Sequence, residues 1–119
     1  MGYIDGYVLP VRRDRIDDYR KIAKTLLAIW IEHGALSAVE AVADDVPDGA
    51  VTSFPLSVKA SPHETVVFAF ITYRDRAHRD EVRAKAAADP RMQQPDARIV
   101  DGERMIWGGF RCLVSMGAA

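Results

Sequence analysis

The chain has 119 residues, of which 49% are hydrophobic and 28% are charged, and its formal net charge at pH 7 is -1. This length and balance predict one domain over residues 1–119 with a core of its own, and they exclude a disordered polypeptide. The charge lacks the basic excess of most nucleic-acid modules, so nucleic acid is not the expected partner.

The chain also lacks the sequence features of a membrane or secreted protein. No apolar run approaches the ~20 residues that a membrane helix needs, and the first ten residues lack the basic and apolar parts of a signal peptide. The single cysteine, Cys112, permits no intrachain disulfide and suits a reducing compartment. These features predict a cytoplasmic protein without membrane contact.

The first half of the chain predicts a strand, a long helix and a second strand. Residues 3–11 have strand composition, and Asp14 is a candidate N-cap for a helix that ends before Gly34. Residues 36–43 predict the second strand, with Glu40 in its middle. The helix has one apolar stripe, formed by Ile16, Tyr19, Ala23, Leu26, Leu27 and Trp30.

Residues 44–63 predict an arm inserted between two strands. The insertion begins with turn-forming residues, and Pro55 lies within its ambiguous segment, residues 51–60. Because proline breaks a central strand, we expect an arm or short hairpin there rather than a core strand.

The second half repeats the order of strand, helix and strand. Residues 66–73 form an uncharged run that is apolar on both alternate faces, so both faces of this strand should be covered. Asp75 is a candidate N-cap for a helix that continues to residue 88, before Pro90. Residues 105–114 predict the last strand, and residues 116–119 a frayed tail.

This order predicts an α+β fold with a ferredoxin-like βαββαβ antiparallel sheet and both helices on one face. If Gly6 and Gly108 face the helices, the other face carries many aromatic side chains. Such a surface predicts a homodimer through the sheet face, burying roughly 800 Å² per partner. The residues expected on that face are Tyr3, Asp5, Tyr7, Glu40, Phe68, Phe70, Trp107 and Arg111.

A series of phrases along nearly the whole chain resembles a family of small bacterial proteins, domain of unknown function 1428. The resemblance implies the dimeric α+β barrel superfamily, in which two ferredoxin-like sheets pack face to face. Its relatives include cofactor-free oxygenases, haem-degrading enzymes, isomerases and ligand-sensing domains, and it implies no established activity. The phrases include Asp5-Gly6-Tyr7-Val8, Glu32-His33-Gly34-Ala35-Leu36, Asp44-Asp45-Val46-Pro47, Ser53-Phe54-Pro55, Ala88-Asp89-Pro90-Arg91 and Arg104-Met105-Ile106-Trp107-Gly108-Gly109-Phe110.

Three charged residues are candidates for chemistry between the paired sheets. Asp5 and Glu40 could have raised pKa values and act as general bases, with Arg111 holding an anionic substrate. The alternative is that these charges form ion pairs across the dimer interface or lie at its rim, and such pairs are the more common case.

The histidines and the cysteine give weaker signals. His33 could shuttle a proton, although a histidine there more often interacts with the helix dipole. No histidine or cysteine spacing typical of a metal site is present, so no metal or other cofactor is expected. Cys112 is more often a buried small apolar residue than a nucleophile. The arginines of the second helix, among them Arg79 and Arg83, predict a solvated face.

These observations favour a homodimer with one small-molecule pocket per protomer. One hypothesis is a cofactor-independent oxygenase or isomerase; the alternative is a non-catalytic ligand-binding or assembly module. RNA binding is a third hypothesis, because residues 68–73 resemble part of an RNA-recognition motif without its basic residue and glycine. The pocket residues expected are Tyr7, Trp30, Phe68, Phe70, Trp107 and Arg111, with Asp5, Glu40 or His33 moving a proton.

Overall fold

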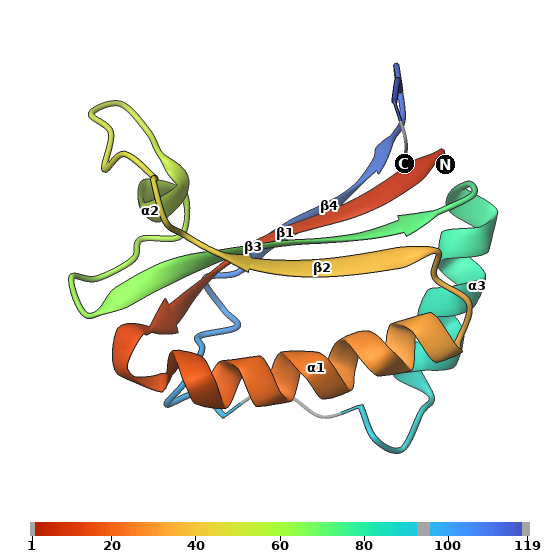
Figure 1. Ribbon diagram of the computed structural model, residues 1–119, viewed down its shortest axis with the longest axis horizontal. Coiled ribbons are helices and arrows are strands. Elements are labelled where there is room, and N and C mark those ends of the chain that lie inside the picture. The colour runs from red at the N-terminus through yellow and green to blue at the C-terminus, as the bar shows by residue number, and fades with distance from the viewer. Residues whose placement is uncertain (1, 93–95, 118–119) are drawn as a thin grey trace.

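The computed structural model describes residues 2–92 and 96–117. It is a mixed α+β structure with a four-stranded antiparallel sheet and the two long helices that the sequence predicts, and it has a short third helix that the sequence does not predict (Figure 1). The elements in chain order are β1 (Tyr3–Arg12), a 3-10 turn (Arg13–Arg15), α1 (Ile16–Glu32), β2 (Ser37–Val42), α2 (Phe54–Ser57), β3 (Glu64–Tyr73), α3 (Arg76–Ala87) and β4 (Ile106–Arg111).

The strands lie in the order β2-β3-β1-β4, so β1 and β3 are central and β2 and β4 are the edges. All three pairings are antiparallel. Tyr7 lies opposite Ala69 of β3 and Trp107 of β4, which fixes the register across three strands. The uncharged run of residues 66–73 is therefore a central strand, as its composition predicts.

Helices α1 and α3 lie on one face of the sheet, and α2 lies on the opposite side (Figure 1). The core between α1 and the sheet includes Leu9, Tyr19 and Val67. A second cluster, which includes Tyr73 and Val82, packs α3 against the other end of the sheet. Two helices thus cover one face, here called the helix face, while the other face, here called the open face, lacks such a layer.

The register corrects the predicted face of several residues. Asp5 and Glu40 hydrogen-bond to side chains of α3 and α1, so both lie on the helix face. Strand pairing places four other residues there as well, namely Tyr3, Tyr7, Trp107 and Arg111. Of the residues predicted for the open face, only Phe68 and Phe70 lie on it.

The glycines explain this error. The sequence assigns Gly6 and Gly108 to the helix face because packing against helices is tight there. In the structure both lie on the open face beneath the Phe110 ring, and a Cβ atom on Gly108 would lie 3.6 Å from Phe110 Cε1. The glycine that permits close packing on the helix face is Gly109, where a Cβ atom would lie 2.3 Å from the Tyr3 hydroxyl oxygen.

Helix α1 starts later than predicted but ends as predicted. Asp14 is not its N-cap; the side chain pairs with Arg12 at 3.1 Å within the 3-10 turn that precedes the helix. At the other end Gly34 has a φ of 113°, and the Ala35 N–H donates to the Trp30 carbonyl. This is a Schellman-type end, for which glycine is suited.

The arm contains a helical turn rather than a hairpin. Ser53 caps α2 by accepting a hydrogen bond from the Leu56 N–H at 3.0 Å, and Pro55 lies in the first turn, where no N–H is needed. Val58 anchors the arm in a small buried cluster with Val8 and Val66.

Helix α3 is capped by Asp75 as predicted, because the carboxylate accepts from the His78 N–H at 2.8 Å. Its buried face differs from the prediction. Ala77 is exposed, and His78 and Arg79 are buried with Val82 and Ala86. The assignment of Arg79 to a solvated face was therefore wrong.

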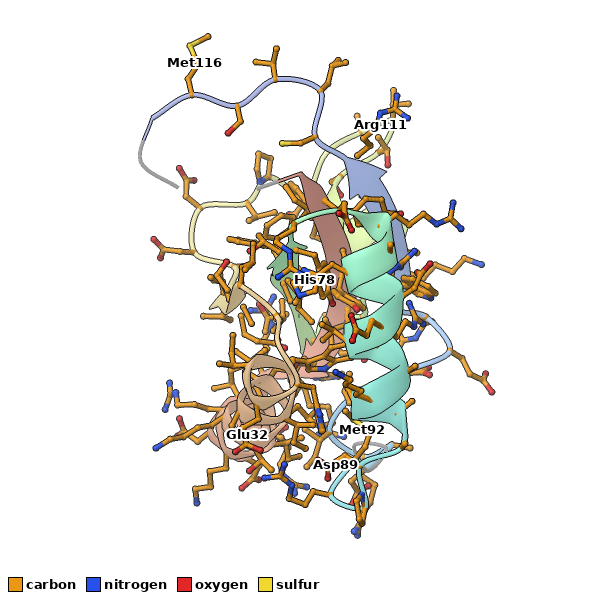
Figure 2. All side chains as sticks on the ribbon, turned by 90° about the vertical axis from the view of Figure 1, so that its right-hand side faces the viewer. Glu32, His78, Asp89, Met92, Arg111 and Met116 are labelled. Atoms are coloured by element: carbon orange, nitrogen blue, oxygen red, sulfur yellow. The ribbon has the colours of Figure 1, made fainter. Side chains whose placement is uncertain are left out.

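The last strand is shorter than predicted. It ends at Arg111, and Cys112 is half-buried outside the strand, donating its N–H to the Gly2 carbonyl at 2.9 Å. The following residues leave the sheet, and Figure 2 shows this tail, with Met116, away from the strands and helices.

Candidate functional site

The strongest candidate site is a cleft of about 500 Å³ between α1 and the edge strand β2. We call it the α1/β2 cleft. Its walls are mostly apolar, while Arg20 and Lys24 contribute charge. The apolar residues that line it are Ile16, Tyr19, Ala23 and Leu27 from α1, Ala38, Val39, Ala41 and Val42 from β2, and Val67 from β3; Glu40 is the carboxylate among them. The register turns the side chains of Val39 and Ala41 towards the open face.

One polar pair lies inside this apolar lining. The Tyr19 hydroxyl donates to Glu40 Oε1 at 2.6 Å. Burial raises the pKa of the Glu40 carboxyl above its usual value, against the opposing effect of the Tyr19 hydrogen bond. Burial also raises the pKa of Tyr19, so its hydroxyl stays protonated and remains the donor. A carboxyl held in this way can take up or release a proton closer to neutral pH.

Asp5 lies in a separate, fully buried cluster. Arg79 Nη1 donates to Asp5 Oδ1 at 2.9 Å, and Arg79 also contacts the Tyr3 hydroxyl at 3.3 Å. Burial raises the pKa of the Asp5 carboxyl, while the Arg79 charge lowers it. Asp5 Oδ2 and the neighbouring Tyr73 hydroxyl make no well-formed hydrogen bond. The Asp5 carboxylate forms an ion pair within the chain and does not line the α1/β2 cleft.

Tyr7 and Trp107 form an aromatic pair on the helix face. Their ring centroids are 6.2 Å apart, and the Arg83 guanidinium lies 4.0 Å above the Trp107 ring. Burial raises the pKa of Tyr7 to about 12, so this hydroxyl is neutral at physiological pH. Arg111 is exposed at the end of β4, opposite Tyr3, and away from the α1/β2 cleft.

The remaining candidates lie in three other places. His33 Nε2 contacts Asp89 Oδ2 at 2.8 Å at the end of α1. Trp30 packs against the cluster beneath α3. Phe68 and Phe70 lie side by side on the open face, with their ring centroids 6.1 Å apart. The structure therefore separates residues that the sequence grouped into one pocket, and only Glu40 lies in the α1/β2 cleft.

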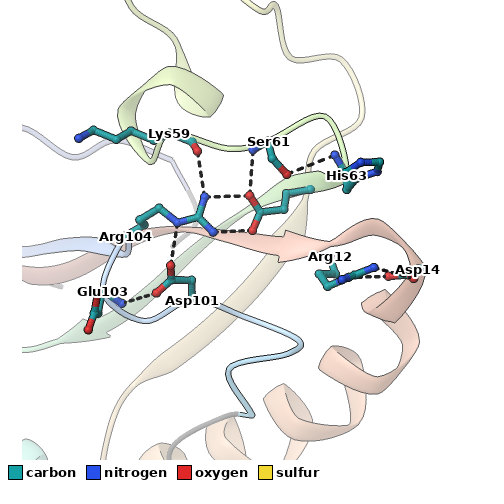
Figure 3. A network of polar contacts seen from close by, with 9 residues as sticks. Arg12, Asp14, Lys59, Ser61, His63, Asp101, Glu103 and Arg104 are labelled. Atoms are coloured by element: carbon teal, nitrogen blue, oxygen red, sulfur yellow. Dashed lines mark hydrogen bonds and ion pairs between the residues drawn. The ribbon is translucent and has the colours of Figure 1, made fainter.

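A second hollow, of about 580 Å³, lies beneath the arm. Its carboxylate Glu64 accepts two hydrogen bonds from Arg104, at 2.8 and 2.6 Å, and Arg104 also binds Asp101 and the Lys59 carbonyl (Figure 3). Arg104 lowers the pKa of Glu64 to about 2. Glu64 is therefore ionised and paired with Arg104 at neutral pH. We infer that this network holds the arm against the start of β3.

The sequence analysis did not identify the two side chains that bind the Glu40 and Asp5 carboxylates, namely Tyr19 and Arg79. Tyr19 is assigned only to the apolar stripe of α1, although its hydroxyl reaches Glu40. Arg79 lies next to His78 and three residues before Val82, a spacing that places it beside the buried face of α3. That spacing was the available signal for Arg79, and none was available for Tyr19.

The described residues contain no group of three or more histidine, cysteine or acidic side chains placed to hold a metal ion. Within the same residues, every helix is too short or too polar to cross a bilayer.

Comparison with known proteins gives a family but no activity. The family model described as "Protein of unknown function (DUF1428)" matches residues 2–102. The "Uncharacterized protein YbaA" of Escherichia coli strain K12 is 44% identical over 115 residues, which cover 96% of this chain and 98% of that protein. The protein of the same description from Shigella flexneri shows the same identity and coverage.

Proposed function

Because the chain belongs to the DUF1428 family of proteins of unknown function, we propose its function from the geometry of its site. The proposal is a homodimeric enzyme of the ferredoxin-like, dimeric α+β barrel type. It binds a small apolar or aromatic molecule in the α1/β2 cleft and moves a proton within it, as an isomerase does.

The observation that carries this proposal is the Glu40–Tyr19 pair. A carboxylate on an apolar wall is costly unless it is paired, and here its partner is a neutral hydroxyl at 2.6 Å rather than a cation. The raised pKa of Glu40 is the property that a general acid or base requires. The fully buried carboxylate of Asp5 is neutralised by Arg79 and lacks the combination found at the half-buried Glu40.

The chemistry that fits is proton transfer next to a carbonyl group. Glu40 would accept a proton from a carbon atom of the ligand and return it to another atom of the same molecule, so that no oxidant is needed. Tyr19 would position Glu40 through its hydrogen bond. A cofactor-independent oxygenase would begin with the same proton removal and then require molecular oxygen as co-substrate.

The sheet order supports the fold part of the proposal. The order β2-β3-β1-β4, with α1 and α3 on one face, is the arrangement expected of a ferredoxin-like protomer. The open face supports the dimer, because it exposes Phe68 at 44%, Ile106 at 47% and Phe110 at 62% of their surfaces. A patch of this kind marks an interface more often than a solvated surface.

The test combines ligand binding with proton exchange. Small aromatic and apolar ketones would be screened for thermal stabilisation, since a ligand that prefers the native state raises its stability. Each hit would then be followed by NMR in D₂O for deuterium uptake at the carbon beside the carbonyl. We expect Glu40→Gln to retain binding but slow exchange by roughly 100-fold or more, and Tyr19→Phe to slow it less.

A matched control is Glu81→Gln, which makes the same change at an exposed carboxylate outside the cleft. Unchanged exchange in Glu40→Gln would exclude the proton-transfer role. Binding without any exchange in the wild type would favour the second candidate, a non-catalytic ligand-binding or assembly protein, which the exposed phenylalanines of the open face also suit. Salt-dependent retention of a monomer on RNA would instead support the third hypothesis.

A further inference from the structure

We propose that the C-terminal tail, residues 112–116, docks into a groove beside α2 on a second copy of the chain. The inference rests on the proposed dimer and goes beyond it, because it assigns a partner and a position to a segment that the sheet-face interface does not explain.

The tail is apolar and has almost no contact with its own protomer. Leu113 is 90% exposed, Val114 is 76% exposed and Met116 is 90% exposed. Figure 2 shows Met116 well away from the sheet and both long helices. Three exposed apolar side chains of this size within four residues are unfavourable in water, so their burial against a partner would be favourable.

The groove offers an apolar site of matching chemistry. It has a volume of about 150 Å³ and lies on the open face where the arm meets the sheet. Phe54 of α2 contacts Phe68 of β3 edge to face, with ring centroids 6.1 Å apart, and forms one side. The other lining residues are mostly aliphatic, namely Val8, Ala41, Val42, Ala43, Val46, Val66 and Val67, with Asp44 at one edge.

The positions of the tail and arm favour exchange between copies. Both project from the open face, and they lie at opposite ends of the sheet, in a molecule whose longest dimension is 38 Å (Figure 1). A tail therefore cannot reach the groove of its own copy. If two open faces pack about a two-fold axis across the strands, each tail lies at the same end of the sheets as the partner's arm. An axis along the strands would instead place each arm at the same end as the partner's arm.

Charge and area agree with this arrangement. Arg111, at the base of the tail, and Asp44, Asp45 and Asp48, beside the groove, form no ion pair within the described parts of the chain. Exchange would bring these opposite charges together. A stable interface buries about 800 Å² per partner, and exposed apolar residues of the sheet, α2 and the tail would all contribute to it.

Cross-linking through native residues tests the inference. Cys112 is the only thiol in the chain, and Lys59 belongs to the arm. Equal amounts of ¹⁴N- and ¹⁵N-labelled protein would be mixed, allowed to exchange and treated with a short amine-to-thiol reagent. We expect Cys112–Lys59 cross-linked peptides that carry one label on each side. The double variant Leu113→Asp/Met116→Asp should lose them and raise the dimer Kd by about tenfold or more.

Ile31→Asp is the matched control, since Ile31 is exposed by 45% on α1, away from the tail and groove; it should leave the dimer unchanged. A wild-type dimer that gives no mixed-label cross-link would overturn the tail exchange and leave the sheet-face dimer standing. A wild-type chain that remains monomeric at micromolar concentration would overturn both. Cross-links within a single label only would show that the tail binds its own copy.

Discussion

At the scale of single residues, the buried Asp5–Arg79 ion pair carries a sharp stability prediction. Asp5 is fully buried and Arg79 is 9% exposed, so removing Arg79 leaves the Asp5 charge without a partner, and removing Asp5 leaves Arg79 with its second, more exposed partner Asp80 at 2.9 Å. We expect Asp5→Leu and Arg79→Met each to lower the free energy of unfolding by about 3–5 kcal/mol, and the double variant to recover most of the loss.

Urea unfolding of the two single variants and the double variant forms a thermodynamic cycle that measures this coupling. Glu81→Leu is the control, because it breaks only the exposed Glu81–Lys85 pair and should cost less than ~1 kcal/mol. Additive losses in the cycle would contradict an interaction between Asp5 and Arg79.

Glu40 carries a prediction about pH. Its folded-state pKa lies above the ordinary value of 4.5 because of burial, so the folded state prefers the neutral carboxyl. This contribution to stability is fully present below pH 4.5 and is lost as the pH rises through the folded pKa. Glu40→Gln should therefore gain melting temperature relative to the wild type as the pH rises from 4 to 7. A constant offset across this range would show that burial does not perturb Glu40.

The residue scale also shows the limit of sequence reasoning. Alternation correctly grouped Tyr3, Asp5 and Tyr7 on one side of β1, but alternation alone does not say which side faces the helices. That choice rested on Gly6, and a glycine fits equally well beneath an aromatic ring such as Phe110. The deciding contact, between Asp5 and Arg79, joins residues 74 positions apart.

At the scale of elements, the Arg104–Glu64 pair fastens the arm to the start of β3. Arg104 holds Glu64, Asp101 and the Lys59 carbonyl together (Figure 3). We expect Arg104→Gln to lower the free energy of unfolding at pH 7 by roughly 1–2 kcal/mol, because a charge-assisted, part-buried pair of hydrogen bonds is lost. Arg76→Gln, at an exposed and loose pair of 3.9 Å, is the control.

The same pair determines part of the acid sensitivity. Glu64 has a folded pKa of about 2, below its ordinary value of 4.5. Its contribution to stability is present above pH 4.5 and is lost as the pH falls toward 2. Thermal melts across this window should therefore fall less steeply for Arg104→Gln than for the wild type. Equal slopes would show that Glu64 is not responsible.

The types and order of the four strands and the two long helices followed from local pattern, whereas α2 and some boundaries did not. The caps at Gly34 and Asp75 depend on nearby residues, and both were predicted correctly. Asp14 failed as a cap because Arg12, two residues earlier, binds its carboxylate. The end of β4 depends on pairing with β1, whose first described strand residue, Tyr3, lies opposite Arg111. The end of β4 is therefore set by β1 and cannot be predicted from residues 105–114 alone.

At the scale of the whole molecule, the open face carries the prediction about the oligomeric state. Phe68 and Phe110 are exposed in a single protomer, and in the proposed dimer they form its core. We expect Phe68→Asp or Phe110→Asp to convert the dimer to a monomer at micromolar concentration, because a buried carboxylate without a partner is strongly unfavourable. Analytical ultracentrifugation would measure this. A monomeric wild type, or a dimer that tolerates both changes, would exclude the sheet-face interface.

The candidate site illustrates what a sequence can and cannot predict at this scale. Glu40 stood out as a lone carboxylate in an apolar strand, and it does line a cavity. The cavity itself forms between α1 and β2, and its width depends on how α1 crosses the sheet. Tyr7, Trp107 and Phe68 were assigned to the same pocket because they are aromatic, yet the register distributes them over two faces.

The start of β1 and the end of β4 lie side by side, since the Cys112 N–H donates to the Gly2 carbonyl and the Gly2 N–H donates to the Tyr73 carbonyl (Figure 1). The polypeptide could therefore be circularly permuted, with a short peptide joining the old ends and new ends opened in the exposed turn near Asp48. Such a permuted chain would keep every strand pairing, but residues 113–116 would be tethered to their own protomer. Comparing it with the wild type would therefore separate the effect of the tail on assembly from its effect on folding, without changing a side chain of the sheet.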